Sequence, residues 1–368
     1  MLDSSLRPVG QARKSIAVIG AGIAGLACAR ICVDKGYTVT VFDKGRGPGG
    51  RLSSRRLEAP QSSDPMVFDH GAQYLTIRDE GFDQLLKPLV QNKQIRPFQG
   101  EVIRLSADGA SRPVVGEESH RGGERWYGSP SMSMVPKALA NGLDLRLRTK
   151  ITEIRAISDR GWVLDGEETL FGPYDMVAVT VPAPQAAALL EQPAPALAKT
   201  ARTAEMAPCW AVMLGLAEPC GIGFDSAFLS ATDGPLAWIS RSDSRPGRFS
   251  DPAVAGGCWT LHASPDWSQR HLEEPAQWVI EQLVEAFRDI SGLETLPTIM
   301  RVQAHRWRYA KVIKPAQGLS PRQPCLWDAD LGVGIAGDWT SGERVEDAWK
   351  AGQALGQAMT AVELQETA

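Results

Sequence analysis

The chain has 368 residues, of which 43% are hydrophobic and 22% are charged, and its formal net charge is −4. This is the composition of an ordinary globular protein, which excludes fibrous, disordered and disulfide-framework classes, and the length predicts two or three domains. No long run of one charge sign occurs, so the sequence does not indicate nucleic-acid binding or a polybasic membrane patch.

The first predicted unit of the chain is a strand, a glycine-rich turn, a helix and a second strand. An apolar run at 16–19 precedes Gly20, Gly22 and Gly25, a helical pattern follows, and a second strand at 37–42 ends at Asp43. The glycines permit a tight turn, close approach of a pyrophosphate and close helix packing, while the helix N-terminus favours negative charge. Asp43 is spaced to accept hydrogen bonds from a ribose diol. The whole unit predicts dinucleotide binding.

Residues 13–29 also match a secretory signal in their basic start and apolar stretch. The glycine spacing and the second strand favour dinucleotide binding over a signal peptide. No other stretch of the sequence is long and apolar enough to span a membrane. The six cysteines form no CxxC pair and are interpreted as core residues, so the sequence favours a cytoplasmic protein.

The segment after Asp43, KGRGPGGR (44–51), is glycine-rich and basic. Its arginines can make bidentate contacts with phosphate oxygens, although a solvated basic loop explains the segment equally well. The acid followed by this GGR loop resembles the flavoprotein family that includes the monoamine oxidases, which implies FAD as the dinucleotide. The resemblance implies non-covalent FAD, because the last cysteine, Cys325, precedes the C-terminal motif that would carry a covalent link.

Near the C-terminus, an apolar run at 331–336 predicts a buried strand, and the pattern at 345–359 predicts a helix. Asp338 follows the strand. In the FAD-binding fold that this arrangement resembles, such an acid holds the ribityl or pyrophosphate part, and the helix N-terminus faces the pyrimidine edge of the flavin, whose charge it stabilises. Glu346 and Asp347 in the first turn are equally explained by ordinary helix capping.

Several stretches are similar to renalase and the bacterial renalase-like flavoproteins: KGRGPGGRLSSRR (44–56), FDHGAQYLT (68–76), WTLHASPDWS (259–268), HRWRYA (305–310) and GDWTSGERVEDAW (337–349). The resemblance implies FAD contacts from Gly20, Ala21, Gly22, Ile23, Ala24, Gly25, Asp43, Lys44, Arg46, Gly50, Arg51, Gly71, Ala72, Gln73, Tyr74, Ile151, Asp338, Arg344, Val345 and Glu346. Residues 71–74 would lie beside the isoalloxazine ring. Ile151, at the end of a strand that begins near Asp144, would contact the adenine end.

These elements predict an α/β fold. An FAD-binding Rossmann-type domain, of the glutathione-reductase and p-hydroxybenzoate-hydroxylase kind, is interleaved with an α+β substrate domain on a mixed, largely antiparallel sheet. The FAD-binding domain is predicted from residues 10–90, 132–185 and 325–362, the substrate domain from 91–131 and 186–324, and flexible tails at 1–9 and 363–368. The polar loop 241–252 is predicted to be a surface connection or a lid.

The flavin is expected to do the redox chemistry, so no residue is assigned as a certain catalytic residue. Candidates for the substrate pocket are Tyr74, Trp126, Trp238, His262, His305, Trp307, Tyr309 and Arg344. A two-residue period places His305, Trp307 and Tyr309 on one strand face, although core packing explains the two aromatics equally well. For the histidines, a hydrogen-bonded structural role is the simpler interpretation, and their spacing indicates no metal site.

The resemblance to renalase implies oxidation of 2-dihydro or 6-dihydro NAD(P) to NAD(P)+, with O2 reduced to H2O2, so the expected partners are a dihydronicotinamide and oxygen. Monoamine-oxidase relatives use a substrate-domain lysine, and between Lys150 and Lys311 this chain has only Lys199, in a predicted loop. The alternatives are an amine oxidase or desaturase of the same fold, or a non-catalytic flavin-binding module. The sequence leaves the oligomeric state open.

Overall fold

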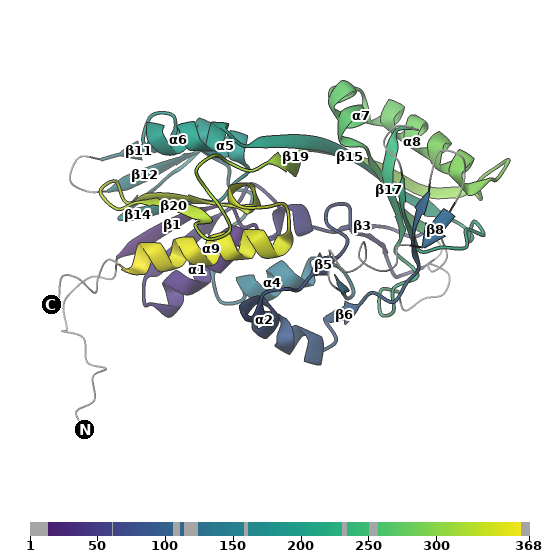
Figure 1. Cartoon of the computed structure of the whole chain (residues 1–368), viewed down its shortest axis with the longest axis horizontal. Coiled ribbons are helices and arrows are strands. Elements are labelled where there is room, and N and C mark those ends of the chain that lie inside the picture. Colours follow the sequence, from purple (N-terminus) through teal and green to yellow (C-terminus); the bar gives the residue numbers. More distant parts are fainter. Residues whose placement is uncertain are drawn as a thin grey trace.

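The structure is a computed structural model, and it describes residues 14–60, 62–105, 111–113, 124–157, 161–229, 234–249 and 257–361. The predicted tails at 1–9 and 363–368 lie outside these ranges. The described chain forms two lobes, each built on one large sheet, and two long strands run from one lobe to the other (Figure 1).

The first lobe contains a sheet of six described strands in the order β10-β2-β1-β14-β21-β20. Their bounds are β10 Asp144–Arg146, β2 Thr38–Phe42, β1 Ser15–Ile19, β14 Met176–Val179, β21 Val333–Ala336 and β20 Cys325–Asp328. All neighbours are parallel except β20, which pairs antiparallel with β21. The central strands are apolar on both faces, as a parallel sheet covered on both sides requires.

Helices α1 (Ile23–Asp34) and α9 (Val345–Thr360) pack against each other on one face of this sheet (Figure 1). Their contact depends on small residues: a Cβ at Gly352 would lie 2.0 Å from the carbonyl oxygen of Ala24. The other face is covered by α5 (Ala183–Leu190), α6 (Pro195–Arg202) and a sheet of β11 (Ile151–Ala156), β12 (Trp162–Gly166) and β13 (Leu170–Tyr174).

The second lobe contains a sheet of seven described strands in the order β19-β15-β18-β17-β16-β7-β8. Their bounds are β19 Ile299–Lys314, β15 Glu205–Leu216, β18 Cys258–Ala263, β17 Leu236–Arg241, β16 Ser226–Leu229, β7 Val102–Leu105 and β8 Ser111–Pro113. Every pairing is antiparallel except that of β16 with β7, which confirms the predicted mixed, largely antiparallel sheet. Helices α7 (Pro265–Arg270) and α8 (Ala276–Ser291) accompany this sheet, and α8 buries Val279, Leu283 and Phe287 against it.

The remaining described elements lie beside the two large sheets, and two of their helices belong to the core of the first lobe. They are η1 (Gly50–Leu52), β3 (Arg55–Leu57), β4 (Met66–Phe68), β5 (Leu75–Thr76), α2 (Glu80–Gln91), β6 (Ile95–Pro97), β9 (Arg125–Gly128), α4 (Met134–Ala140) and η3 (Asp338–Thr340). Met66 and Phe68 of β4 pack on Met213 and Cys258 of the second sheet. Strand β4 is therefore in direct contact with the second lobe.

Several sequence-based boundaries are wrong. Ile151 does not end the strand that starts near Asp144: β10 and β11 are separate strands of different sheets, divided by a turn in which Arg148 has φ 55°. Lys199 lies on α6 rather than in a loop. The pattern at 298–309 predicts a strand that ends at Tyr309, but β19 continues five residues further, to Lys314, because it spans both lobes. The domain limits stay a prediction, and α5 and α6 pack in the core of the first lobe.

Candidate functional site

The turn between β1 and α1 is built by glycine. Gly20 has φ 110°, and its N–H donates to the carbonyl of Phe42 at 2.7 Å. A Cβ at Gly25 would lie 1.9 Å from the Gly20 oxygen, so only glycine permits this approach of helix and turn. Gly22 is the N-cap of α1, and a Cβ there would meet nothing within 4 Å. The N-terminus of α1 therefore faces open space, which fits the binding of a diphosphate.

Asp43 closes the other side of this turn. Its carboxylate accepts from the N–H of Ala21 at 2.7 Å and from that of Gly45 at 2.6 Å. The N–H of Thr149 donates to the Asp43 carbonyl, which brings the segment before Ile151 next to the same loop. Ile151 itself is buried in the core, and its contact with an adenine ring stays a prediction.

The GRGPGG loop lies directly against the fingerprint turn. Gly49 donates its N–H to the carbonyl of Ala21 at 2.7 Å, and a Cβ at Gly50 would lie 3.7 Å from the Cα of Gly22. Lys44 and Arg46 are exposed at the outer side of the loop. Two glycine-rich segments thus line one cradle, which a larger side chain at Gly22 or Gly50 would enter.

Arg51 joins three parts of the chain that are remote in sequence. Its guanidinium makes two hydrogen bonds to the carboxylate of Asp338, at 2.6 and 2.7 Å, and a third to the carbonyl of Ala310 on β19 at 3.2 Å. The carbonyl of Arg51 accepts from the N–H of Ala72 at 2.8 Å. A Cβ at Gly71 would lie 2.0 Å from the same oxygen, so only glycine fits at this position. The predicted cofactor residues of both chain ends are therefore brought together.

The N-terminus of α9 lies beside the same segment. Arg344 is the N-cap, and its N–H donates to the Asp347 carboxylate at 3.1 Å. Glu346 is buried, and its carboxylate accepts from the N–H of Arg78 at 2.8 Å and pairs with Lys350 at 3.5 Å. Half-buried Val345 packs against the core of the first lobe. The first turn of α9 thus fixes the chain that follows residues 71–74.

Three of the predicted pocket residues gather around His70. The His70 ring stacks on Trp307 at 5.2 Å and meets His305 edge-on at 4.8 Å. The His70 carbonyl accepts from the Trp307 indole at 2.8 Å, and the His262 ring nitrogen lies 3.2 Å from the same oxygen. This cluster, His70, His262, His305 and Trp307, joins β18 and β19 to the segment that contacts Arg51.

Burial keeps the histidines of this cluster neutral. It lowers the pKa of His70 to about 3, with the charges of His305 and Arg55 adding to the effect. Burial also lowers the pKa of His262 to about 4, and that of His305 to about 4 with help from Arg55. At neutral pH the cluster therefore presents uncharged imidazole and indole rings.

These lowered pKa values predict acid lability. In the unfolded chain a histidine titrates near 6.5, so between pH 6.5 and about 4 the unfolded state binds protons that the folded state refuses, and the free energy of unfolding falls as pH falls. The slope is at most about 1.4 kcal/mol per pH unit for each histidine. The free energy of unfolding, measured with urea from pH 7 to 4.5, should depend less steeply on pH for His262→Asn than for the wild type. Equal slopes would contradict this account.

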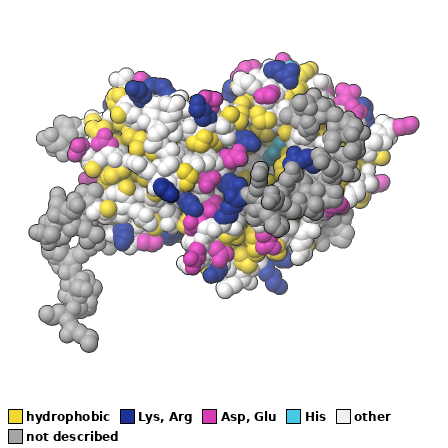
Figure 2. All heavy atoms as spheres, in the orientation of Figure 1, with side chains coloured by type: hydrophobic (Ala, Val, Ile, Leu, Met, Phe, Trp, Pro, Cys, Tyr) yellow, Lys and Arg dark blue, Asp and Glu magenta, His cyan; other side chains and the backbone are white. Residues whose placement is uncertain are grey.

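The other predicted pocket residues lie in different surroundings. Trp238 donates its indole N–H to the side-chain oxygen of Gln73 at 3.2 Å, and its ring lies 6.0 Å from that of Tyr74. Trp126 packs against the core of the first lobe, and Tyr309 is half-buried on β19. Figure 2 shows the surface hollowed between the lobes, with hydrophobic side chains and a histidine inside the hollow.

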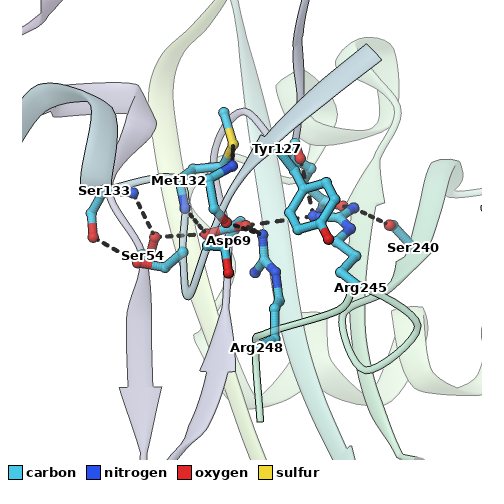
Figure 3. A network of polar contacts seen from close by, with 12 residues as sticks. Ser54, Asp69, Tyr127, Met132, Ser133, Ser240, Arg245 and Arg248 are labelled. Carbon is cyan, nitrogen blue, oxygen red and sulfur yellow. Dashed lines mark hydrogen bonds and ion pairs between the residues drawn. The ribbon is translucent and has the colours of Figure 1, made fainter. Parts of the chain in front are cut away.

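A buried polar network was missed by the sequence analysis (Figure 3). Asp69 accepts from the Ser54 hydroxyl at 2.6 Å and from the N–H of Met132 at 3.0 Å, and it pairs with both Arg245 and Arg248. The two arginines belong to the loop predicted to lie on the surface, yet only 3% and 4% of their surface is exposed. The burial of these two side chains was not predicted, because residues 241–249 contain no apolar pattern and their counter-charge lies more than 170 positions away. Pro246 and Gly247 between them are exposed, and residues 250–252 lie outside the described ranges.

One signal for part of this network was available. Asp69 directly follows the apolar run of β4, so an acid there had to be buried with a partner. Burial lowers the pKa of Arg245 to about 9, and the charge of Arg248 contributes to the shift. Within the described ranges, no group of three His, Cys, Asp or Glu side chains could hold a metal ion, and all six cysteines are free.

Comparison with protein families gives two matches. Residues 18–89 match the NAD(P)-binding Rossmann-like domain, and residues 98–359 match the flavin containing amine oxidoreductase model. The second match covers more than half of the chain. The chain belongs to the flavin-containing amine oxidoreductase family. It is an FAD-dependent oxidoreductase, and the open space at Gly22, where a Cβ would meet no protein atom within 4 Å, fits the approach of the FAD diphosphate.

Relatives of this oxidoreductase have diverse activities. It is 28% identical over 197 residues to the tRNA 5-methylaminomethyl-2-thiouridine biosynthesis bifunctional protein MnmC of Magnetococcus marinus, covering 45% of this chain and 29% of that protein. It is 43% identical over 114 residues to the L-glutamate oxidase precursor of Streptomyces diastatochromogenes, covering 30% and 17%. The chain thus spans less than a third of the length of these curated relatives.

Solved structures confirm the fold. A protein from Exiguobacterium sp. 255-15 described as a protoporphyrinogen oxidase superposes with a TM-score of 0.75 at 12% identity, over 96% of this chain and 100% of that one. A double mutant of putrescine oxidase superposes with a TM-score of 0.65 at 12% identity, over 95% and 99%. Among the residues described, no helix is long and apolar enough to cross a membrane.

Proposed function

We propose that this FAD-dependent oxidoreductase is an oxidase of the renalase type. Its substrates would be the 2-dihydro or 6-dihydro isomers of NAD(P), and the balanced reaction is dihydro-NAD(P) plus O2 plus a proton to NAD(P)+ plus H2O2. The observation that supports the proposal most directly is the uncharged cluster of His70, His305 and Trp307, which lies against the segment that contacts Arg51.

The cluster suits a substrate from which no proton has to be removed. FAD, when bound, accepts a hydride and passes the electrons to O2. A dihydropyridine that loses hydride becomes an aromatic cation directly, whereas a protonated amine must first lose a proton. The chain's part is to bind the flat ring between aromatic side chains and to exclude water, and neutral imidazole and indole rings serve both tasks.

The position of Lys199 adds to this argument. It is the only lysine between Lys150 and Lys311, and it is exposed on α6, which packs on the first lobe. His262, His305 and Trp307 of the cluster lie on β18 and β19, in the other sheet. The sequence offers Arg306 and Arg308 either as partners of substrate phosphates or as members of structural ion pairs. Both pair with Glu273, at 2.8 and 2.5 Å, which favours the second interpretation.

The second candidate is oxidation of an amine or desaturation of a carbon chain. It is favoured by the match to the flavin containing amine oxidoreductase model and by the L-glutamate oxidase relative. A third outcome is a flavin-binding module without turnover.

Anaerobic mixing separates these candidates. The purified yellow protein is mixed with 2-dihydro, 6-dihydro or ordinary 4-dihydro NAD(P), or with simple amines, and the flavin absorbance is followed. We expect bleaching by the 2-dihydro or 6-dihydro isomers, and release of H2O2 when air is admitted. Bleaching by amines alone would establish the second candidate, and bleaching by none of these compounds would favour the module.

A further inference from the structure

Two buried arginines contact residues 69–73, the segment that leads from β4 to the candidate site. Arg245 donates to the carbonyl of Gln73 at 3.0 Å and to its side-chain oxygen at 3.4 Å, and it pairs with Asp69 at 3.5 Å. Arg248 pairs with Asp69 and donates to the carbonyl of Gly128 at 3.3 Å. Both guanidinium groups therefore hold the chain between Asp69 and Gln73 from the side of the second lobe (Figure 3).

The charges around this loop are arranged as a dipole. On the side of the segment, two guanidinium groups meet the carboxylate of Asp69. On the other side, the third arginine of the loop, Arg241, lies 2.8 Å from Asp225 and 3.8 Å from Asp243. The arrangement is neutral as a whole, but its positive end contacts the segment. The rings of Phe98 and Tyr127 lie within 6 Å of these guanidinium groups and limit the access of water.

The segment is also close to the cofactor cradle. Gly71 fits against the carbonyl of Arg51, in the loop beside Gly22 and Gly50, and Gln73 is only two residues further along the chain. Two residues span at most about 7 Å. A charge that contacts Gln73 therefore acts on a cofactor bound beside Arg51 and Gly71 through buried protein, where screening by water is weak.

We propose that Arg245 and Arg248 are positioning residues of this oxidoreductase, which hold residues 69–73 and present positive charge to the bound cofactor. A flavin gains negative charge on reduction, so a nearby positive charge favours its reduced form. One unit charge at about 10 Å, with an effective dielectric constant of about 20, changes such an equilibrium on the order of tenfold. The inference rests on FAD binding and not on the identity of the substrate.

The test is the reduction potential of bound FAD in a series of variants that change the charge of the network. Arg248→Met removes one positive charge from it, Gln73→Glu adds one negative charge to it, and Asp69→Asn removes the negative charge of Asp69. We expect the first two to lower the reduction equilibrium constant about tenfold, which is about 30 mV for a two-electron couple. Asp69→Asn should raise it by a similar factor. Arg288→Met, an exposed substitution on α8 of the same charge type, should leave the potential within twofold of the wild type.

Opposite signs distinguish a charge effect from damage to the fold. Loss of packing alone would move all network variants in one direction, and that result would overturn the proposal. Gln73→Glu is the variant that best preserves the fold, because its new carboxylate retains acceptors for Trp238 and Arg245. An unchanged potential in FAD-loaded Gln73→Glu and Arg248→Met would also overturn it. The potential is measured with a redox dye and no dihydronicotinamide, so a failure here is distinct from a failure of the proposed function.

Discussion

The variant Gly25→Ala is expected to lose FAD on purification and to unfold at lower denaturant concentration. The new methyl group would lie 1.9 Å from the Gly20 oxygen and 2.6 Å from the Thr180 hydroxyl, so α1 must move away from the sheet. Overpacking of this kind costs about 1–3 kcal/mol of stability. The same movement displaces the helix N-terminus from the diphosphate, so FAD affinity should fall at least about tenfold. Urea unfolding and FAD titration of the apoprotein measure the two effects.

Gly22→Ala is the matched control, because its methyl group should affect FAD binding without affecting the packing of the protein. A Cβ at Gly22 meets no protein atom within 4 Å, and its φ of −74° suits any residue. The apoprotein should therefore be as stable as the wild type, while the methyl group enters the cradle and weakens FAD binding by about 10- to 100-fold, the range expected for disturbing one hydrogen bond to a charged group. Normal FAD affinity in Gly22→Ala would show that the diphosphate does not approach this turn.

The variant Arg51→Met is expected to have the second large effect. It leaves the Asp338 carboxylate, whose side chain is 6% exposed, without its bidentate partner, and it removes the link to β19. Breaking such a buried pair costs about 3 kcal/mol. Because Arg51, Ala72 and Asp338 border the cradle together, FAD affinity should fall along with the midpoint of thermal unfolding, and Arg51→Lys should restore little, since lysine cannot make both bonds.

The control for Arg51 is Arg155→Met. Arg155 also makes a bidentate contact, with Asp165, but that pair lies on the outer sheet of β11, β12 and β13. Its loss should leave FAD affinity unchanged and the unfolding midpoint nearly so, because exposed pairs contribute little. If Arg51→Met bound FAD as tightly as Arg155→Met, the joining of the two chain ends at Asp338 would have no role in the site.

Local patterns were sufficient to predict the glycine-rich turn and the central strands of the first lobe. Gly20, Gly22 and Gly25 act within one turn, and the apolar runs of β1, β2 and β21 report burial on both faces of a parallel sheet. The apolar spacing at 278–287 predicts a helix over 275–290, and α8 spans Ala276–Ser291, within one residue at each end. By contrast, the end of β19 and the separation of β10 from β11 depend on partners in other parts of the chain, which no local pattern reports.

The sequence by itself therefore determined the glycine-rich turn and the main apolar strands and helices, which depend on residues that are neighbours in the chain or recur with the period of a helix or strand. The FAD cofactor and the mixed second sheet were implied by the resemblance to known flavoproteins. Only the tertiary structure showed that Arg51 pairs with Asp338 and that Arg245 and Arg248 are buried against Asp69. The physical reason is that an ion pair produces no periodic pattern in the sequence. Its two members are single polar residues, here 287 and 176–179 positions apart. Each of them by itself is typical of a solvated loop.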